Sequence, residues 1–305
     1  MVAFLKLIRY QNLLMVLLML VLTKYAIITS FTTLFSLQFT LLIISILCIT
    51  ASGYIFNDIY DLKTDLINKP NKVYIGKSIT HKAAWHAYYA FTIAGLIIGG
   101  AATYLKGNTY YIFFFVVSVL LLYSYSKWLK RIAFVGNFVV AFLTALPLFM
   151  VAVFEKENTA TANNILEALI HFFDLIPMTT ALFCYYIFAF SMTLIREIIK
   201  DIEDIKGDYA LKMKTLPILI GIQRTKNITF VIATFVFLFL VVLLKEELIH
   251  FQLLFWYAIL FVIVPFAWFL FQLKSAKSQL NFSKLSRLLK IIMCFGILSM
   301  LFIQL

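Results

Sequence analysis

The sequence predicts an all-α polytopic membrane protein with nine transmembrane helices and a cytoplasmic N-terminus. Of its 305 residues, 63% are hydrophobic and only 13% are charged, and the mean hydropathy is +0.98, values far from those of soluble proteins. Apolar runs of about 20 residues, the length that crosses a bilayer, recur along the whole chain. We expect helices near residues 12–34, 39–57, 84–105, 109–127, 133–154, 176–197, 228–244, 249–272 and 287–305, in a single domain covering 1–305.

The distribution of basic residues predicts the orientation. With nine spans and the N-terminus inside, 22 of the 26 lysines and arginines fall in internal segments. The four external ones are Lys24, Lys106, Lys156 and Lys245. The positive-inside rule therefore places the internal loops in the cytoplasm. The net charge of +12 follows from this topology and indicates contact with anionic lipid headgroups, not with nucleic acid. The expected location is a prokaryotic cell membrane.

The residues that flank the first two spans indicate different features. The first follows Lys6 and Arg9 and has no convincing small-residue cleavage site, so we interpret it as a retained span and not as a signal peptide. The second ends at Asn57, with Ser52 and Gly53 just before it. Small residues at these positions allow close packing of neighbouring helices.

Two acidic motifs follow the second and the sixth spans. Each places three aspartates three and then four residues apart, namely Asp58, Asp61 and Asp65 in the first motif and Asp201, Asp204 and Asp208 in the second. On a helix this spacing puts all three side chains on one face. Like charges that close repel by about 1 kcal/mol per pair or more, even when solvated. The motifs therefore predict a bound cation, although two solvated helix ends remain the alternative.

Basic and aromatic side chains accompany the motifs on the same side of the membrane. Lys69 and Lys72 follow the first motif, and Arg196 precedes the second. Tyr123 and Lys127, at the end of the fourth span, are four residues apart and share a helix face. A tyrosine and a lysine at this boundary can also be ordinary membrane anchors.

Carboxylates flanked by lysines predict a diphosphate held through Mg²⁺. Mg²⁺ prefers oxygen ligands and is commonly held by one or two carboxylates plus substrate phosphates. It would neutralise the charge that develops on a leaving diphosphate. A diphosphate that meets its metal at a membrane boundary carries a lipid tail, and an allylic prenyl diphosphate fits because an apolar helix bundle protects its carbocation from water.

The chain resembles the UbiA family of intramembrane prenyltransferases over essentially its whole length. Residues 57–65 match the family motif N-D-x-x-D-x-x-x-D, residues 201–208 match D-x-x-D-x-x-x-D, and Tyr123 with Lys127 matches Y-x-x-x-K. The resemblance implies nine helices around a central cavity and an enzyme that transfers a prenyl group. The loop after the first motif departs from the family's R-P-x-P-S-G, because it reads N-K-P-N-K-V-Y-I-G-K-S. Its Lys72 supplies charge but not the bidentate fork of an arginine.

The resemblance also implies roles for individual residues. The metal ligands would be Asn57, Asp61, Asp204 and Asp208. Asp58 and Asp65 would contact substrate, with Lys69, Lys72 and Arg196 as further contacts to the diphosphate or the acceptor. The catalytic group would comprise Asp201, Asp204, Tyr123 and Lys127, of which the last two assist departure of the diphosphate.

The acceptor and the class of protein have alternatives. The phrases around both motifs are most similar to the branch of the family that transfers geranylgeranyl groups to geranylgeranylglyceryl phosphate. Prenylation of an aromatic acceptor in quinone biosynthesis is the second hypothesis. A CDP-alcohol phosphotransferase would need the D-G-x-x-A-R opening, which the chain lacks, and a transporter would carry charges at midmembrane. The oligomeric state is not indicated by the sequence.

Overall fold

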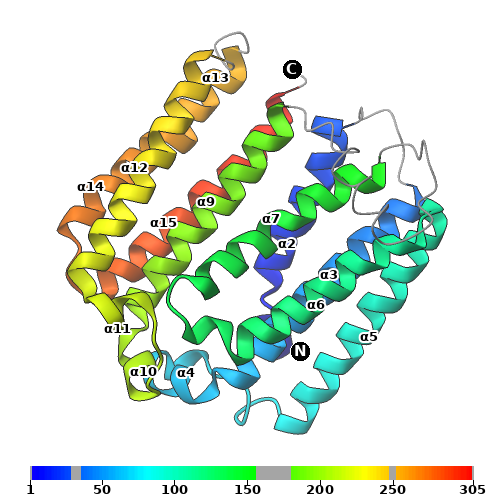
Figure 1. Ribbon diagram of the computed structural model, residues 1–305, viewed down its shortest axis with the longest axis horizontal. Coiled ribbons are helices and arrows are strands. Elements are labelled where there is room, and N and C mark those ends of the chain that lie inside the picture. The colour runs from blue at the N-terminus through cyan, green and yellow to red at the C-terminus, as the bar shows by residue number, and fades with distance from the viewer. Residues whose placement is uncertain (1, 29–35, 156–179, 247–251, 304–305) are drawn as a thin grey trace. The chain divides into compact units, whose positions relative to one another are not determined.

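The computed structural model describes residues 2–28, 36–155, 180–246 and 252–303. The helices in these ranges are α1 (Val2–Leu7), α2 (Tyr10–Leu22), η1 (Thr23–Ile28), α3 (Leu37–Tyr60), α4 (Leu62–Asn68), η2 (Pro70–Lys72), α5 (His81–Lys106), η3 (Thr109–Tyr111), α6 (Ile112–Lys127), η4 (Leu129–Arg131), α7 (Val135–Glu155), α9 (Thr180–Glu203), α10 (Ile205–Ala210), α11 (Leu216–Ile220), α12 (Ile222–Glu246), α13 (Gln252–Ala258), η6 (Ile259–Ile263), α14 (Val264–Ser275), α15 (Gln279–Leu298) and η7 (Ser299–Phe302) (Figure 1).

Nine helical stretches of 19 to 26 residues, counted over the described ranges, are long and apolar enough to cross a membrane. The predicted all-α class and the nine spans are confirmed. The chain divides into two compact units: residues 1–127 with 146–183 form the first, and residues 128–145 with 184–305 form the second. The chain passes between the units within α7, next to Pro147, and also after residue 127 and within α9 after residue 183.

In the first unit, α3 packs along α5 and α6 through small residues (Figure 1). A Cβ added to Gly95 of α5 would lie 2.7 Å from Ile49 of α3, and the hydroxyl of Ser45 donates to the Gly95 carbonyl oxygen at 2.6 Å. A Cβ on Gly53 would lie 2.9 Å from Leu122 of α6. Lipid tails are as apolar as leucine, so close packing of this kind, and not the hydrophobic effect, holds membrane helices together.

The far end of the first span is a π-helical segment, η1, that contains a buried ion pair. Lys24 is only 3% exposed. Its Nζ lies 2.9 Å from Oε2 of Glu155, the last residue of α7, and 4.3 Å from the ring centroid of Phe39. The sequence predicts Lys24 in an external segment, whereas the structure places it in the last turns of the span, because Glu155 and the aromatic ring compensate its charge.

The loop between α4 and α5 is anchored by apolar side chains. Ile75 is 3% exposed and packs with Leu7, Ile55 and Ala84. Gly76 adopts a φ of +81°, which glycine accepts without strain. The side chain of Thr80 then accepts a hydrogen bond from the backbone N–H of Ala83 and caps α5. The loop therefore has a fixed backbone while several of its lysines face outward.

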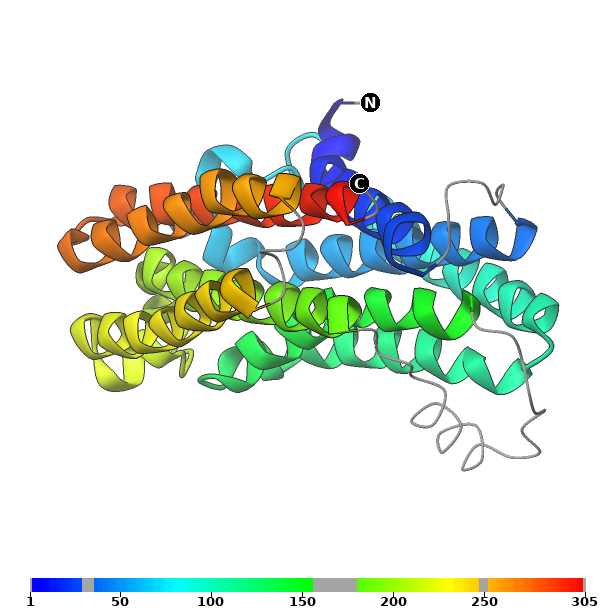
Figure 2. The same ribbon diagram turned by 90° about the horizontal axis from the view of Figure 1, so that it is seen from above.

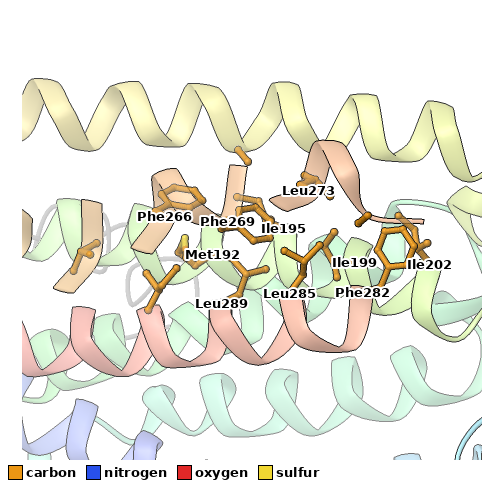
Figure 3. Close-up of a cluster of buried hydrophobic side chains, with 14 of the residues drawn as sticks. Met192, Ile195, Ile199, Ile202, Phe266, Phe269, Leu273, Phe282, Leu285 and Leu289 are labelled. Carbon is orange, nitrogen blue, oxygen red and sulfur yellow. The ribbon is translucent and has the colours of Figure 1, made fainter. Parts of the chain in front are cut away.

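The core of the second unit lies between α9, α12, α14 and α15. Figure 3 shows side chains of three of these helices meeting in it, namely Met192, Ile195, Ile199 and Ile202 from α9, Phe266, Phe269 and Leu273 from α14, and Phe282, Leu285 and Leu289 from α15. Helices α14 and α15 run side by side in both views (Figure 1 and Figure 2). Many small dispersion contacts between these side chains stabilise the four-helix arrangement.

Two spans of this unit begin earlier than the sequence predicts. The seventh begins at Ile222 and the ninth at Gln279, where the predictions are 228 and 287. In the seventh span Lys226 is accommodated because it has partners: its Nζ donates to the carbonyl oxygens of Lys274 at 3.2 Å and Ala276 at 2.7 Å. This lysine satisfies the last carbonyls of α14.

Candidate active site

The first aspartate motif spans a junction between two helices. α3 ends at Tyr60 and α4 begins at Leu62, and Asp61 stands between them with φ −86° and ψ 0°. The helical hydrogen-bond pattern nevertheless continues: the N–H of Asp61 donates to the carbonyl of Asn57 and that of Asp65 to the carbonyl of Asp61, both at 2.8 Å.

The second motif has the same construction. α9 ends at Glu203, α10 begins at Ile205, and Asp204 stands between them with φ −96° and ψ 6°. Its N–H donates to the carbonyl of Lys200 at 2.8 Å, and the N–H of Asp208 donates to the carbonyl of Asp204 at 3.2 Å. Each motif is therefore broken between two helices at its middle aspartate. Residue spacing cannot reveal this break, because the i to i−4 hydrogen bonds persist through it.

Asp58, the first aspartate of the first motif, is held by a residue that the sequence did not indicate. Nη2 of Arg9 lies 2.7 Å from Oδ1 of Asp58, and the guanidinium carbon is 4.9 Å from the ring centroid of Tyr54. Burial acts to lower the pKa of Arg9, but the attraction of Asp58 outweighs it and the pKa is raised. The guanidinium therefore keeps its charge and orients the carboxylate of Asp58.

Asn57 and Asp61 lie together at the end of α3. Nδ2 of Asn57 donates to Oδ2 of Asp61 at 2.6 Å. An amide oxygen and a carboxylate are hard oxygen donors of the kind Mg²⁺ prefers. The structure thus places this pair of predicted ligands in contact.

Asp201, the first aspartate of the second motif, is held by an amide. Nδ2 of Asn137, in the first turn of α7, donates to Oδ2 of Asp201 at 2.9 Å. Asn137 is 7% exposed. Asp208, the third aspartate of the motif, is also only 7% exposed, whereas Asp201 and Asp204 are half-buried.

The basic residues before the second motif have an acidic partner of their own. Both carboxylate oxygens of Glu197 accept hydrogen bonds from Nζ of Lys200, at 3.0 and 2.9 Å. Nη1 of Arg196 donates to the same carboxylate at 3.0 Å. Arg196, predicted as a substrate contact, therefore belongs to an ion-pair cluster around Glu197, which is 8% exposed.

Tyr123 and Lys127 share a helix face, as the sequence predicts. Nζ of Lys127 donates to Oη of Tyr123 at 2.9 Å. The ring of Tyr123 stacks on Phe56, with centroids 5.1 Å apart and an interplanar angle of 28°. Phe56 directly precedes Asn57, so the stack brings the tyrosine next to the first motif.

The lysines of the loop after the first motif differ in their surroundings. Lys69 stands between α4 and η2, and its N–H donates to the carbonyl of Asp65 at 2.8 Å. Lys72 is at the surface. Nζ of Lys77 donates to the carbonyl of Pro70 at 2.8 Å. Of the predicted pair, Lys69 thus follows the third aspartate closely and Lys72 faces solvent.

The donor atoms fit Mg²⁺ without forming a ready-made cage. Within the described ranges, no group of three or more His, Cys, Asp or Glu side chains is arranged to hold a metal ion. Mg²⁺ usually takes only one or two carboxylates and completes its octahedron with water and substrate phosphate oxygens. Asn57 and Asp61 in the first unit, and Asp204 and Asp208 in the second, are donor sets of this kind.

Residues 12–291 match the family model of the UbiA prenyltransferase family. The chain belongs to this family. The resemblance that the three motifs indicate is therefore confirmed, and with it the predicted enzyme class of prenyltransferase.

Several archaeal proteins named digeranylgeranylglyceryl phosphate synthase are similar to this UbiA chain. The protein of Saccharolobus solfataricus is 33% identical over 219 residues, which is 72% of this chain and 68% of that protein. The protein of Sulfurisphaera tokodaii is 31% identical over 189 residues, 62% of this chain and 60% of that protein. For Methanococcus vannielii the identity is 34%, over 63% of this chain and 59% of the relative. The chain thus spans about 60% of the length of some of these curated relatives.

Solved structures share the fold. A structure described as giving insights into digeranylgeranylglyceryl phosphate synthase in membranes has a TM-score of 0.66 at 23% identity, covering 99% of this chain and 98% of that one. A UbiA homolog from Archaeoglobus fulgidus, bound to GPP and Mg²⁺, has a TM-score of 0.58 at 16% identity, covering 98% and 99%. At these identities the likeness shows the fold alone.

Arg9, Asn137 and Glu197 are the residues that the sequence did not single out. Arg9 lies at the start of the first span, on the side predicted for Asp58, so the predicted topology already put the two charges in one layer. Asn137 is a strong donor inside an apolar span, and polar residues there are rarely without a role. Glu197 lies three residues before Lys200, the spacing of a helical ion pair.

Proposed function

We propose that this chain is a Mg²⁺-dependent prenyltransferase that transfers a geranylgeranyl group from its diphosphate to the hydroxyl of geranylgeranylglyceryl phosphate. The observation that carries the proposal is the repeated junction, in which Asp61 and Asp204 occupy the same backbone position of two matched motifs. The names of the archaeal relatives support the acceptor. Structures of UbiA homologs bound to GPP or DMAPP with Mg²⁺ support the donor and the metal.

Each motif has a role in holding the diphosphate. Asn57, Asp61, Asp204 and Asp208 hold Mg²⁺, which neutralises the charge of the diphosphate when bound. Arg9 fixes Asp58 and Asn137 fixes Asp201, so the first aspartate of each motif is positioned before substrate arrives. Asp58, Asp65, Lys69, Lys72 and Arg196 contribute to substrate binding, directly or by orienting their neighbours.

The Tyr123 and Lys127 pair suits the leaving group. The hydroxyl oxygen of Tyr123 accepts a hydrogen bond from Lys127, and in the reaction this hydroxyl donates to a diphosphate oxygen. The bond between the allylic carbon and the diphosphate oxygen breaks, and its electron pair leaves with the diphosphate. The lysine charge adds electrostatic stabilisation to the same oxygen.

The acceptor completes the reaction. Its hydroxyl oxygen forms the new bond to the allylic carbon, and its proton passes to a carboxylate of the second motif, Asp201 or Asp204. Apolar spans keep water from the carbocation. An acceptor phosphate also suits the surplus of cations beside the second motif, at Lys206, Lys212 and Lys214. An aromatic acid, the second candidate acceptor, would bring only a carboxylate.

The basic residues further support an N-terminus in the cytoplasm and both motifs on the cytoplasmic face of a prokaryotic cell membrane. Reporters fused near Lys72 and Lys212 should be cytoplasmic, and one fused after Leu305 should be external. A cytoplasmic C-terminal reporter would contradict this topology.

A competition assay tests the acceptor. Purified protein receives geranylgeranyl diphosphate, Mg²⁺ and equal amounts of geranylgeranylglyceryl phosphate and 4-hydroxybenzoate. We expect the glyceryl phosphate to be alkylated and diphosphate to be released only when both Mg²⁺ and the acceptor are present. Exclusive prenylation of the aromatic acid would overturn the acceptor, and release of no diphosphate under any condition would overturn the activity.

A further inference from the structure

A groove separates the exposed edges of α14 and α15 in the second unit. It encloses about 330 Å³ and is lined by Trp268, Gln272, Asn281, Lys284, Leu285 and Leu288. It lies at the same end of the unit as the second aspartate motif. This follows because Lys226, near the start of α12, is bonded to the carbonyls at the end of α14, and because α12 follows α10 and α11 directly.

The lining changes from polar to apolar along the groove. Gln272 and Asn281 lie nearest the hairpin turn at 276–278, which joins the two helices. Lys284 lies about one turn deeper, and Trp268 and Leu288 lie deeper still, since each helical turn rises about 5.4 Å. Amide and ammonium groups at the mouth and apolar groups below match the order of a phospholipid, with its headgroup above its acyl chains. Tryptophan is typical of this depth in a membrane.

The charge on the two helices that form the groove is of one sign. The chain from residue 250 to 305 contains five basic residues and no acidic one, the basic ones being Lys274, Lys277, Lys284, Arg287 and Lys290. The helices that form the groove therefore supply no carboxylate to neutralise Lys284. Basic pockets between transmembrane helices attract lipids with anionic headgroups, and each basic residue near the surface strengthens that attraction.

We infer that the groove between α14 and α15 is a binding site for one anionic phospholipid of the leaflet that the second motif faces. The phosphate is held by Lys284 with the amides of Gln272 and Asn281. An acyl chain lies along Trp268, Leu285 and Leu288. The inference does not rest on the proposed activity, because it uses none of the residues assigned to prenyl transfer.

Brominated lipids test the site through Trp268. The purified protein is placed in vesicles in which dibromo-phosphatidylglycerol or dibromo-phosphatidylcholine replaces part of a phosphatidylcholine background. Bromine quenches tryptophan fluorescence only at contact. The emission of the Trp268→Phe variant is subtracted from that of the unchanged protein, so that the difference reports Trp268 and not the other three tryptophans. We expect half-quenching of Trp268 at about a fivefold lower mole fraction of the anionic lipid than of the neutral one.

Charge variants separate a built site from general surface charge. Lys284→Gln should abolish most of the fivefold preference, and Lys284→Arg should keep it. Lys274→Gln is the matched control, because Nζ of Lys274 lies 4.7 Å from the ring centroid of Phe230 and Lys274 does not line the groove. Equal quenching by both lipids, or equal losses in Lys284→Gln and Lys274→Gln, would overturn the site.

Discussion

In the first unit a charged guanidinium holds Asp58, whereas in the second unit a neutral amide holds Asp201. The backbones around the two aspartates are nearly the same, since a single residue with φ near −90° separates a long helix from a short one in both. The repeated motif thus determines where the carboxylates lie on the backbone. The neighbouring helices determine whether a charged or a neutral side chain contacts them. The first carboxylate of the first motif is paired with the charge of an arginine, whereas the first carboxylate of the second motif contacts a neutral amide.

The largest effect should come from the junction residues, because the comparison makes them equivalent. Asp61→Asn and Asp204→Asn should each lower turnover by about 10²-fold or more, the cost typical of groups that stabilise developing charge. Steady-state release of diphosphate at saturating Mg²⁺ measures this, with detergent-solubilised yield as the control for folding. A large loss in only one of the two variants would break the equivalence.

Removing the charge of Arg9, the partner of Asp58, should lower stability more than removing the amide of Asn137, the partner of Asp201. In Arg9→Gln another non-glycine residue occupies the position with φ +51°, so the backbone strain is the same. The variant removes the guanidinium charge that pairs with Asp58. We expect a loss of about 2 kcal/mol, less than for a fully buried pair because the Arg9 side chain is 36% exposed. Thermal unfolding in detergent provides the measurement. Adding Asp58→Asn should restore most of the loss, and no recovery in the double variant would argue against the pair.

The tyrosine of the first unit should contribute to turnover and little to stability. Tyr123→Phe keeps the stack on Phe56 and removes only the hydroxyl that Lys127 contacts. We expect about a tenfold decrease in kcat with unchanged unfolding, since general acid and hydrogen-bonding groups contribute at least that much. Tyr125→Phe, two residues along the same helix, is the matched control. Unchanged kcat in Tyr123→Phe would assign the pair to membrane anchoring.

The smallest effect should come from Asn137, the neutral partner of Asp201, and should be seen in the free energy of unfolding. Asn137→Ala removes one amide hydrogen bond to Asp201 and should cost about 1 kcal/mol, roughly half the effect of Arg9→Gln. The same unfolding measurement gives the ratio of the two losses. Equal losses would mean that the charge of the holder does not distinguish the two motifs.

Much of this architecture could be predicted, because it follows from local sequence. Long apolar runs predict the spans, and the spacing of Tyr123 and Lys127 predicts their contact. The partners of Asp58 and Asp201 are 49 and 64 residues away, so only helix packing reveals them. The helix breaks at Asp61 and Asp204 leave no trace in the spacing of the motifs. α15 begins before its predicted start because its first turns carry basic residues, which in a sequence favour a loop.

The buried pair between Lys24 and Glu155 has a consequence for biosynthesis. The two residues are 131 positions apart, which at 5 to 20 residues per second corresponds to roughly 7 to 26 seconds of translation. During that interval the first span carries an ammonium near its end without the carboxylate that pairs with it, at a cost below the roughly 2.5 to 3.5 kcal/mol of a charge at the centre of a bilayer. Phe39, the ring nearest to Nζ, is made first, and the carboxylate arrives only with the fifth span. We therefore expect this ion pair to form only after the fifth helix has been made.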